Sequence, residues 1–346
     1  MEDILKDKLK IGLIGAGRIG KIHAENIARL PNASLEGIAD LNYGHDLVKW
    51  GEKLGARIFS QNPYDFFLEK SSIEAVAICS ATDTHADLII AAAKAGKHIF
   101  CEKPIDMAIP KVKEALSVVK TAGVKLQIGF NRRFDHNFRQ IREFRVAGDL
   151  GNVHIVKITS RDPAPPPASY VATSGGIFLD MMIHDFDMAR FQAGSEITEV
   201  FTQGAVLVDP EIGKAGDVDT AIVTLRFANG AIGVIDNSRK AVYGYDQRVE
   251  VFGSKGLAQA ENDLPNTVKL SNSNGVIGEK PLYFFLERYK NAFFDEMLSF
   301  VDAVLNKKPV EVSGEDGLED MYAAVAAGIS LKENHPVKIE EIRKQF

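Results

Sequence analysis

Acidic, imidazole and apolar side chains alternate in the segment FLDMMIHDFDMARF, residues 178–191. If the chain from Asp180 to Arg190 is helical, Asp180 and His184 lie four residues apart on one helix face. An aspartate one turn from an imidazole can fix its tautomer and stabilise the imidazolium that forms on proton uptake. Such a pair is what a dehydrogenase needs beside an alcohol, because a base must take the hydroxyl proton while the carbon gives up a hydride.

Two other interpretations of this segment compete with an acid–base pair. A solvated helix face is disfavoured, because methionine and isoleucine residues surround the polar ones. A zinc site would need more nitrogen or sulfur ligands, and no cysteine or second histidine lies at metal spacing. We therefore predict an acid–base pair and no metal, with Asp185 and Asp187 anchoring the helix.

A glycine-rich turn near the amino terminus could hold a nucleotide. The sequence Gly-Ala-Gly-Arg-Ile-Gly (15–20) matches G-x-G-x-x-G, follows an apolar run and precedes an amphipathic segment. Such glycines permit a tight turn, close approach of the backbone to a pyrophosphate, and close packing of helix on strand. A glycine turn without a ligand is the alternative. We predict cofactor contacts from Gly15, Gly17, Arg18, Ile19 and Gly20.

Asp40 strengthens the nucleotide interpretation. It ends the second apolar run, 20 residues after Gly20, where a carboxylate can accept hydrogen bonds from both adenosine ribose hydroxyls. It would repel a 2′-phosphate, and Leu41 and Asn42 offer no cation to hold one. The pattern favours NAD over NADP and leaves dual use open.

Two more polar stretches follow apolar runs, where ligands bind in parallel sheets. One is Ser-Ala-Thr-Asp-Thr-His (80–85) and the other is Glu-Lys-Pro (102–104). Asp83 or Thr84 could instead cap a helix that begins near His85, and Glu102 with Lys103 could be a surface ion pair. We predict further cofactor contacts from Ser80, Thr82, His85, Glu102 and Lys103.

The arrangement of predicted elements gives the fold class. Six short apolar runs alternate with helical segments as far as residue 130, which predicts an α/β, doubly wound parallel sheet. Beyond it, the proline-rich stretch 162–170 predicts an extended loop, and consecutive strand candidates predict a large, mostly antiparallel, open-faced sheet with late helices. We expect a Rossmann domain at 1–129 and a substrate-binding, oligomerising α+β domain at 130–346.

Composition excludes several classes of partner. The 346 residues carry a formal charge of −6, which gives no electrostatic footprint for nucleic acid or an anionic membrane. No apolar run approaches the roughly 20 residues that span a bilayer, and the amino terminus lacks the apolar core of a secretory signal. The two cysteines, Cys79 and Cys101, lie in apolar runs and resemble buried free thiols. We expect a cytoplasmic protein that forms a dimer or tetramer.

The motifs together resemble the glucose-fructose oxidoreductase, inositol dehydrogenase and rhizopine catabolism (Gfo/Idh/MocA) superfamily. The resemblance spans nearly the whole chain and includes GAGRIG, CEKP (101–104) and GGIFLDMMIHDFD (175–187). EKP and GG-x3-D-x3-H are shared widely in the superfamily. RDPAPPP (161–167) and IHDFDMARF (183–191) look most like the bacterial inositol 2-dehydrogenases.

The resemblance implies roles for particular residues. His184 would be the general acid/base, Asp180 its orienting partner, and Lys103 a donor to the reacting oxygen. The implied reaction is NAD-dependent oxidation of a cyclic polyol, myo-inositol to 2-keto-myo-inositol (scyllo-inosose). Some relatives have His-Arg-Asn where this chain has Ser-Arg-Asp (160–162), which leaves the preferred isomer open. Besides Asp180 and His184, the candidate substrate-binding residues, each of which could equally be structural, are Arg133, Asp162, Tyr243, Tyr245 and Tyr289.

Other functions stay open beside this one. The substrate could be scyllo-inositol, another inositol isomer or a pyranose sugar. From a different class, the chain could be a non-catalytic NAD(H)-binding regulator, although such a sensor has no need of Lys103, Asp180 and His184 together.

Overall fold

The structure is a computed structural model that describes residues 8–67 and 71–346. The amino-terminal residues 1–7, on which the absence of a secretory signal was partly predicted, lie outside the described residues. Contacts divide the chain into two compact units, one ending at Asn131 and taking in Phe293–Glu319, the other comprising Arg132–Ala292 and Asp320–Phe346. The expected division at residue 130 placed residues 293–319 in the second unit, whereas their contacts assign them to the first.

The first unit is built on a six-stranded parallel sheet with the order β3-β2-β1-β4-β5-β6. This is the doubly wound order, which confirms the predicted fold class and places the switch point between β1 and β4. The strands are β1 (Leu9–Ile14), β2 (Ala33–Ala39), β3 (Ile58–Ser60), β4 (Ala75–Ile78), β5 (His98–Glu102) and β6 (Leu126–Gly129).

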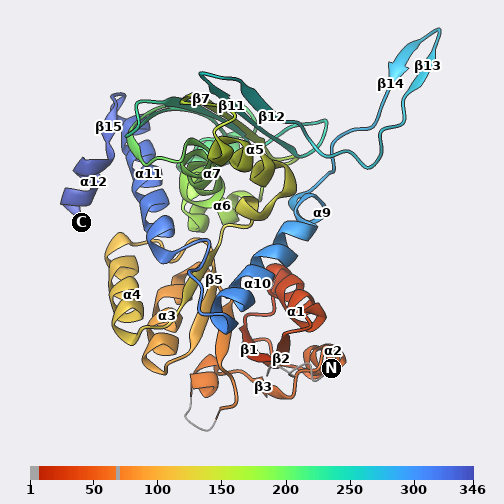
Figure 1. Ribbon diagram of the computed structural model, residues 1–346, viewed down its shortest axis with the longest axis vertical. Helices are drawn as coiled ribbons and strands as arrows, with labels where there is room; N and C mark the ends of the chain where they lie inside the picture. Colours follow the sequence, from red (N-terminus) through yellow and green to blue (C-terminus); the bar gives the residue numbers. More distant parts are fainter. Residues whose placement is uncertain (1–7, 68–70) are drawn as a thin grey trace. The chain divides into compact units, whose positions relative to one another are not determined.

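Helices cover both faces of this sheet, α3 and α4 on one side and α1 and α10 on the other (Figure 1). Alternate strand residues such as Ile11 and Phe100 pack with Ile27 of α1 and Phe300 of α10, and all four are fully buried. Burying each such side chain contributes about 1.5–3 kcal/mol. The helices of this unit are α1 (Arg18–Arg29), α2 (His45–Lys53), α3 (His85–Lys94), α4 (Ile109–Ala122) and most of α10 (Lys290–Leu305).

The second unit contains a seven-stranded sheet with the order β12-β11-β7-β10-β9-β8-β15. All neighbours are antiparallel except β7 and β10, which confirms the mostly antiparallel prediction. The predicted turn at Ala228-Asn229-Gly230 joins β9 to β10, and Gly230 has φ 88°. The strands are β7 (Val153–Arg161), β8 (Ile197–Ala205), β9 (Thr220–Phe227), β10 (Ile232–Ser238), β11 (Asp246–Gly253), β12 (Leu257–Ala260) and β15 (Val337–Lys338).

One face of this sheet is covered and the other is open. Val156, Ile158 and Val223 are buried on the inner face, where α7 packs on β7 and α5 on β12, whereas Ile222 and Ile232 of the opposite face are each 49% exposed. The helices of this unit are α5 (His136–Ala147), α6 (Ala168–Ser174), α7 (Ile183–Ala193), α8 (Pro210–Lys214), α9 (Phe285–Arg288), α11 (Gly314–Glu333) and α12 (Ile339–Gln345). The first residues of α11, up to Glu319, belong to the first unit. None of the helices within residues 8–67 and 71–346 has the length and apolar content needed to cross a membrane.

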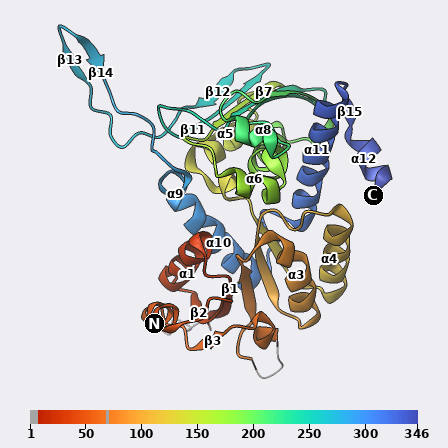
Figure 2. The same ribbon diagram turned by 180° about the vertical axis from the view of Figure 1, so that it is seen from behind.

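A two-stranded arm, β13 (Leu270–Asn272) with β14 (Gly275–Ile277), leaves the second unit and projects away from its sheet in both views (Figures 1 and 2). Among the residues that the structure describes, its two strands pair only with each other.

Three local expectations are corrected. The segment 178–191 is not one α-helix, because a π-turn (Ile177–Met181) precedes α7. The proline-rich loop ends at Pro167, since α6 begins at Ala168. Thr84 occupies the position before α3 but does not cap it with its side chain, because its hydroxyl donates to the carbonyl of Ala81.

Candidate functional site

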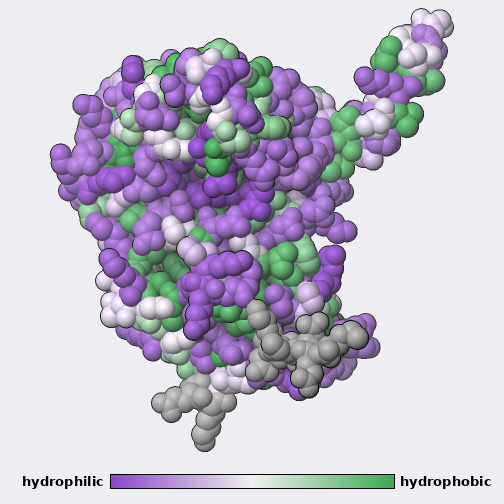
Figure 3. All heavy atoms as spheres, in the orientation of Figure 1, coloured by the Kyte–Doolittle hydropathy of each residue, from purple (hydrophilic) through white to green (hydrophobic). Residues whose placement is uncertain are grey.

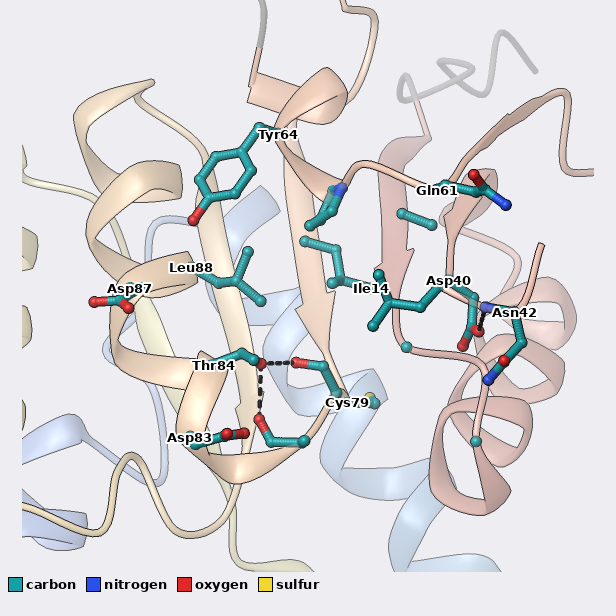
Figure 4. A pocket seen from close by; sticks show the side chains of 17 residues that line it. Ile14, Asp40, Asn42, Gln61, Tyr64, Cys79, Asp83, Thr84, Asp87 and Leu88 are labelled. Atoms are coloured by element: carbon teal, nitrogen blue, oxygen red, sulfur yellow. Dashed lines mark hydrogen bonds between the residues drawn. The ribbon is translucent and has the colours of Figure 1, made fainter.

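A cleft of about 620 Å³ opens at the switch point of the first unit. Figure 4 shows Asp40 and Asn42 on one side of it and Tyr64, Thr84 and Leu88 on the other. Parallel sheets bind ligands at this position because the loops leave the sheet in opposite directions there.

The glycine-rich turn forms part of this cleft and suits a bound pyrophosphate. Gly15 has φ 89°, a backbone conformation that residues other than glycine rarely adopt. A Cβ on Gly17 would meet no atom within 4 Å, so the backbone faces open space there. A Cβ on Gly20 would lie 1.9 Å from the Gly15 carbonyl oxygen, so this glycine allows helix and turn to pack closely. Arg18, Ile19 and Gly20 form the first turn of α1, whose amino terminus favours a phosphate.

The carboxylate of Asp40 holds the turn beside the cleft. Its Oδ2 accepts a hydrogen bond from the backbone N–H of Ala16 at 2.7 Å, and its Oδ1 accepts one from Asn42 at 2.7 Å. Asp40 lines the cleft as predicted for a ribose-binding residue. The cleft, the glycines and the acid together fit NAD.

Of the predicted cofactor residues after β4, Ser80 lines the cleft and His85 is buried in the interior. Ser80 lines the cleft and its hydroxyl bonds that of Thr84 at 2.7 Å, while Thr82 is not among the lining residues. The ring of His85 is buried, with Nδ1 2.9 Å from the Pro104 carbonyl oxygen and Nε2 3.0 Å from that of Ser80. His85 thus connects the turn after β5 to the turn after β4, and its predicted cofactor contact stays a prediction.

Glu102 belongs to a largely buried cluster of ionisable groups. Its Oε1 lies 2.7 Å from Nε2 of His23, which in turn lies 3.8 Å from Oε1 of Glu296. Burial, and then the charge of Glu102, raises the pKa of Glu296 well above its usual range. Lys103 follows at the end of β5 and is half-buried. Both cysteines are free thiols, but only Cys101 is fully buried, and Cys79 lines the cleft.

In the second unit, polar side chains gather at the carboxyl ends of β7 and β10. Because these two strands are parallel, Ser160 pairs with Asn237 on the inner face, and the next inward positions are Asp162 and Arg239. Ser160, Asn237 and Arg239 are at most 1% exposed. Burial raises the pKa of Asp162 to about 6, although the positive charges of Arg239 and Arg132 oppose this shift.

The predicted catalytic residues of this unit lie on the π-turn and on α7. Asp180 belongs to the π-turn, in which the N–H of Met182 donates to the Ile177 carbonyl, and His184 lies in the first turn of α7. Asp180 accepts a hydrogen bond from the Tyr170 hydroxyl at 3.0 Å, and its Oδ2 lies 3.6 Å from Nη1 of Arg239. Single π-turns inside helices are frequent at functional sites.

Asp185 and Asp187 have a larger function than anchoring a helix. Asp185 is fully buried, accepts from Nη1 of Arg132 at 2.5 Å and from Asn237 at 3.0 Å, and so binds α7 to the sheet. Asp187 makes a two-pronged contact with Arg133, with donor–acceptor distances of 2.6 and 2.8 Å. This buried pair gives Arg133 a structural function, and its predicted substrate contact stays a prediction.

The three predicted tyrosines differ in environment. Tyr245 and Tyr289 are buried near Arg132, which lies 3.4 Å from the Tyr245 hydroxyl and over the Tyr289 ring. Tyr243 is 38% exposed and donates to Asp246 at 2.5 Å. Tyr245 and Tyr289 therefore belong to the polar cluster of the inner face, whereas Tyr243 belongs to a surface network.

Several residues of these sites were missed from the sequence. In the first unit, Gln61, Pro63 and Tyr64 line the cleft from a loop that carried no recognised motif. In the second unit, Arg132 and Arg239 were missed. Their position after a strand end was visible, but their partners lie far away in the sequence.

Comparisons with known proteins agree with this geometry. Residues 9–130 match the family described as "Oxidoreductase family, NAD-binding Rossmann fold", and residues 138–259 match the "GFO/IDH/MocA C-terminal domain". Myo-inositol 2-dehydrogenase of Thermotoga maritima is 52% identical over 96% of this chain and 99% of its own length. Inositol 2-dehydrogenase of Rhizobium meliloti is 45% identical, with coverages of 96% and 99%.

A solved structure gives a further comparison. Scyllo-inositol dehydrogenase from Lactobacillus casei, with bound NAD(H) and scyllo-inositol, superposes with a TM-score of 0.89 at 34% identity, covering 96% of this chain and 100% of the other. The family matches span most of both units, and the relatives match over their full lengths. The chain therefore belongs to the Gfo/Idh/MocA family of oxidoreductases, with an NAD-binding Rossmann fold in its first unit.

Proposed function

We propose that this chain oxidises a cyclic polyol with NAD, converting myo-inositol to 2-keto-myo-inositol (scyllo-inosose). The observation that carries the proposal is the polar cluster at the carboxyl ends of β7 and β10, next to the segment that bears Asp180 and His184. A polyol ring needs many donors and acceptors, and buried polar groups discriminate strongly for hydroxyls that satisfy them. The names of the 52% and 45% identical relatives support the inositol substrate.

The chemistry follows from three side chains. The His184 imidazole takes the proton of the reacting hydroxyl, and the carboxylate of Asp180 stabilises the imidazolium that results. Lys103 donates to the same oxygen and steadies its developing negative charge. When bound, NAD supplies the hydride acceptor. The O–H and C–H bonds of one carbinol break, a C=O bond forms, and the proton stays on His184.

A panel of inositol isomers and aldoses, assayed by NADH absorbance with the purified protein, tests the substrate. Turnover of myo-inositol with the highest kcat/KM is the expected result. Higher kcat/KM on scyllo-inositol would favour the second candidate, which the 34% identical scyllo-inositol dehydrogenase supports. NAD binding without turnover of any cyclic polyol or sugar would indicate a non-catalytic NAD(H)-binding regulator instead.

We also propose that the protein is a cytoplasmic homo-oligomer, a dimer or a tetramer. An isolated two-stranded hairpin is marginally stable in water, yet the arm exposes Leu270, Val276 and Ile277 by 57–68%. Hydrophobic residues are visible on the arm in Figure 3. A second copy that covers the arm or the open sheet face would bury these side chains. Light scattering should give a multiple of 37.9 kDa that falls in the variant Val276→Asp/Ile277→Asp, and a monomeric wild type would contradict the proposal.

A further inference from the structure

Arg239 occupies a particular position in the second unit, immediately after the only parallel strand pair within its described sheet. The register pairs Arg161 with Ser238, so the next residues, Asp162 and Arg239, leave the sheet side by side. The N–H of Asp162 donates to the Ser238 carbonyl at 2.9 Å, which holds the two ends together. Arg239 is 1% exposed, so its charge must be balanced within the protein.

Three carboxylates surround this guanidinium. Nη1 lies 3.6 Å from Asp180, Nη2 lies 3.8 Å from Asp217, and the positive charge also acts on Asp162. The two measured distances exceed a hydrogen bond, so the attraction is Coulombic and depends on charge more than on the shape of the guanidinium. Nε and Nη2 are buried, and no acceptor in the described part of the chain bonds them.

One of these carboxylates connects Arg239 to the π-turn. Asp217 Oδ2 accepts a hydrogen bond from the N–H of Ile177, the first residue of that turn, at 2.8 Å. The preceding Gly176 has φ 73°, and a Cβ there would lie 2.8 Å from Oδ1 of Asp217. Arg239 therefore lies close both to Asp217, which anchors the π-turn, and to Asp180, which the π-turn carries.

We infer that Arg239 is a positioning residue, which balances the negative charges of Asp180 and Asp162 and fixes the π-turn that carries Asp180. The inference rests on the proposed dehydrogenase function, because it assigns Arg239 to the support of that reaction's acid–base pair. A residue that only stabilised the fold would not affect how the site titrates.

Asp162 is faced by Arg239 after β10, by Arg132 after β6, by Asp180 on the π-turn and by Asp185 on α7. Loss of the Arg239 charge leaves only Arg132 to oppose the neighbouring acids, so the pKa of Asp162 rises further. The acid limb of the kcat/KM profile should then move to higher pH.

The variant Arg239→Gln tests this, with Arg239→Lys to restore the charge. For Arg239→Gln we expect kcat/KM for the best inositol to fall about 100-fold at neutral pH, with the acid limb displaced upward and NAD binding retained. Arg239→Lys should recover most of the acid limb. The matched control is Arg190→Gln, which removes another buried arginine of this unit, paired with Asp320 and Glu196. It should lower the thermal midpoint and leave the pH profile unchanged.

A second readout does not depend on turnover. The carboxyl carbon of Asp162 in 13C-aspartate-labelled protein, assigned with Asp162→Asn, should titrate at higher pH in Arg239→Gln than in the wild type, while Arg190→Gln leaves its titration unchanged. Titration unaltered by Arg239→Gln, or a loss of stability with an unmoved acid limb, would overturn the inference. If the wild type turned over no inositol but the carboxyl shift appeared, the proposed function would fail and the electrostatic assignment would stand. If Arg239→Gln did not fold, Arg239→Met, which also removes the positive charge, would carry the same titration.

Discussion

The Oδ2 atom of Asp40 accepts a hydrogen bond from the backbone N–H of Ala16, joining the end of β2 to the glycine-rich turn across 2.7 Å. One carboxylate thus shapes the turn and faces the cleft where a ribose would bind. The next two predictions concern residues of the first unit.

Replacing Asp40 with Ser and Leu41 with Arg should shift preference toward NADP. The change removes a negative charge that repels a 2′-phosphate and supplies a cation at an exposed position, where Leu41 is 83% exposed. The ratio of kcat/KM for NAD to that for NADP should fall at least about tenfold, equivalent to about 1.4 kcal/mol. Asp65→Asn, which alters a carboxylate outside the cleft lining, serves as the control. An unchanged ratio would show that the ribose contact is misplaced.

Glu296→Gln should make stability less dependent on pH. Burial and the charge of Glu102 raise the pKa of Glu296, so the folded state holds its proton more tightly than the unfolded state. The stability from this group is complete below its unfolded pKa near 4.5 and is lost as the pH rises toward the folded pKa. Glutamine does not titrate, so urea midpoints should favour the variant more at pH 8 than at pH 5. Glu25→Gln, at an exposed site on α1, should show no such difference. Equal differences at both pH values would contradict the prediction.

Asp162→Asn, in the second unit, should likewise make stability less dependent on pH. Folding raises the pKa of Asp162 from 3.8 to about 6, which corresponds to about 3 kcal/mol. Stability from its proton is present below pH 4 and lost as the pH passes 6, so the variant should gain on the wild type across that interval. Denaturant titrations at pH 4, 5, 6 and 7 measure this. A constant difference between the two proteins would place the pKa of Asp162 elsewhere.

Arg133→Met should unfold the protein more readily without changing its affinity for substrate. The variant leaves Asp187 buried without its two-pronged partner, which costs about 3–5 kcal/mol. The KM for inositol of the folded fraction should stay unchanged. Lys214→Met, which breaks an exposed pair with Glu211, should alter stability by less than about 1 kcal/mol. A large rise in KM with little loss of stability would restore the substrate-binding function predicted from the sequence.

The first unit was predictable because its signals are local. The glycine-rich turn, Asp40 and the strand ends occur at fixed spacings, and alternating runs specify the parallel sheet before any long-range contact is known. The Tyr64 side of the cleft was missed, because the short 3-10 helix Pro63–Phe67 that carries it is too brief to show a periodicity.

The second unit was less predictable because its pairs are distant in sequence. Arg132 and Arg133 bond aspartates 53 and 54 residues away, and neighbouring arginines give no indication of which carboxylate each will meet. Arg239 became recognisable only when β7 and β10 proved to be parallel, which set its side chain beside Asp162. The π-turn adds a residue to a segment whose spacing otherwise suggests a plain α-helix.

The catalytic assignment of His184 is tested most directly by Glu or Ala replacements, of which His184→Ala is the cleaner because it introduces no charge. NADH formation from myo-inositol should fall by at least about 1,000-fold, since the site loses its proton acceptor, while NAD binding measured by calorimetry stays within about twofold of the wild type. Turnover retained at the wild-type rate would contradict the central claim that His184 takes the hydroxyl proton.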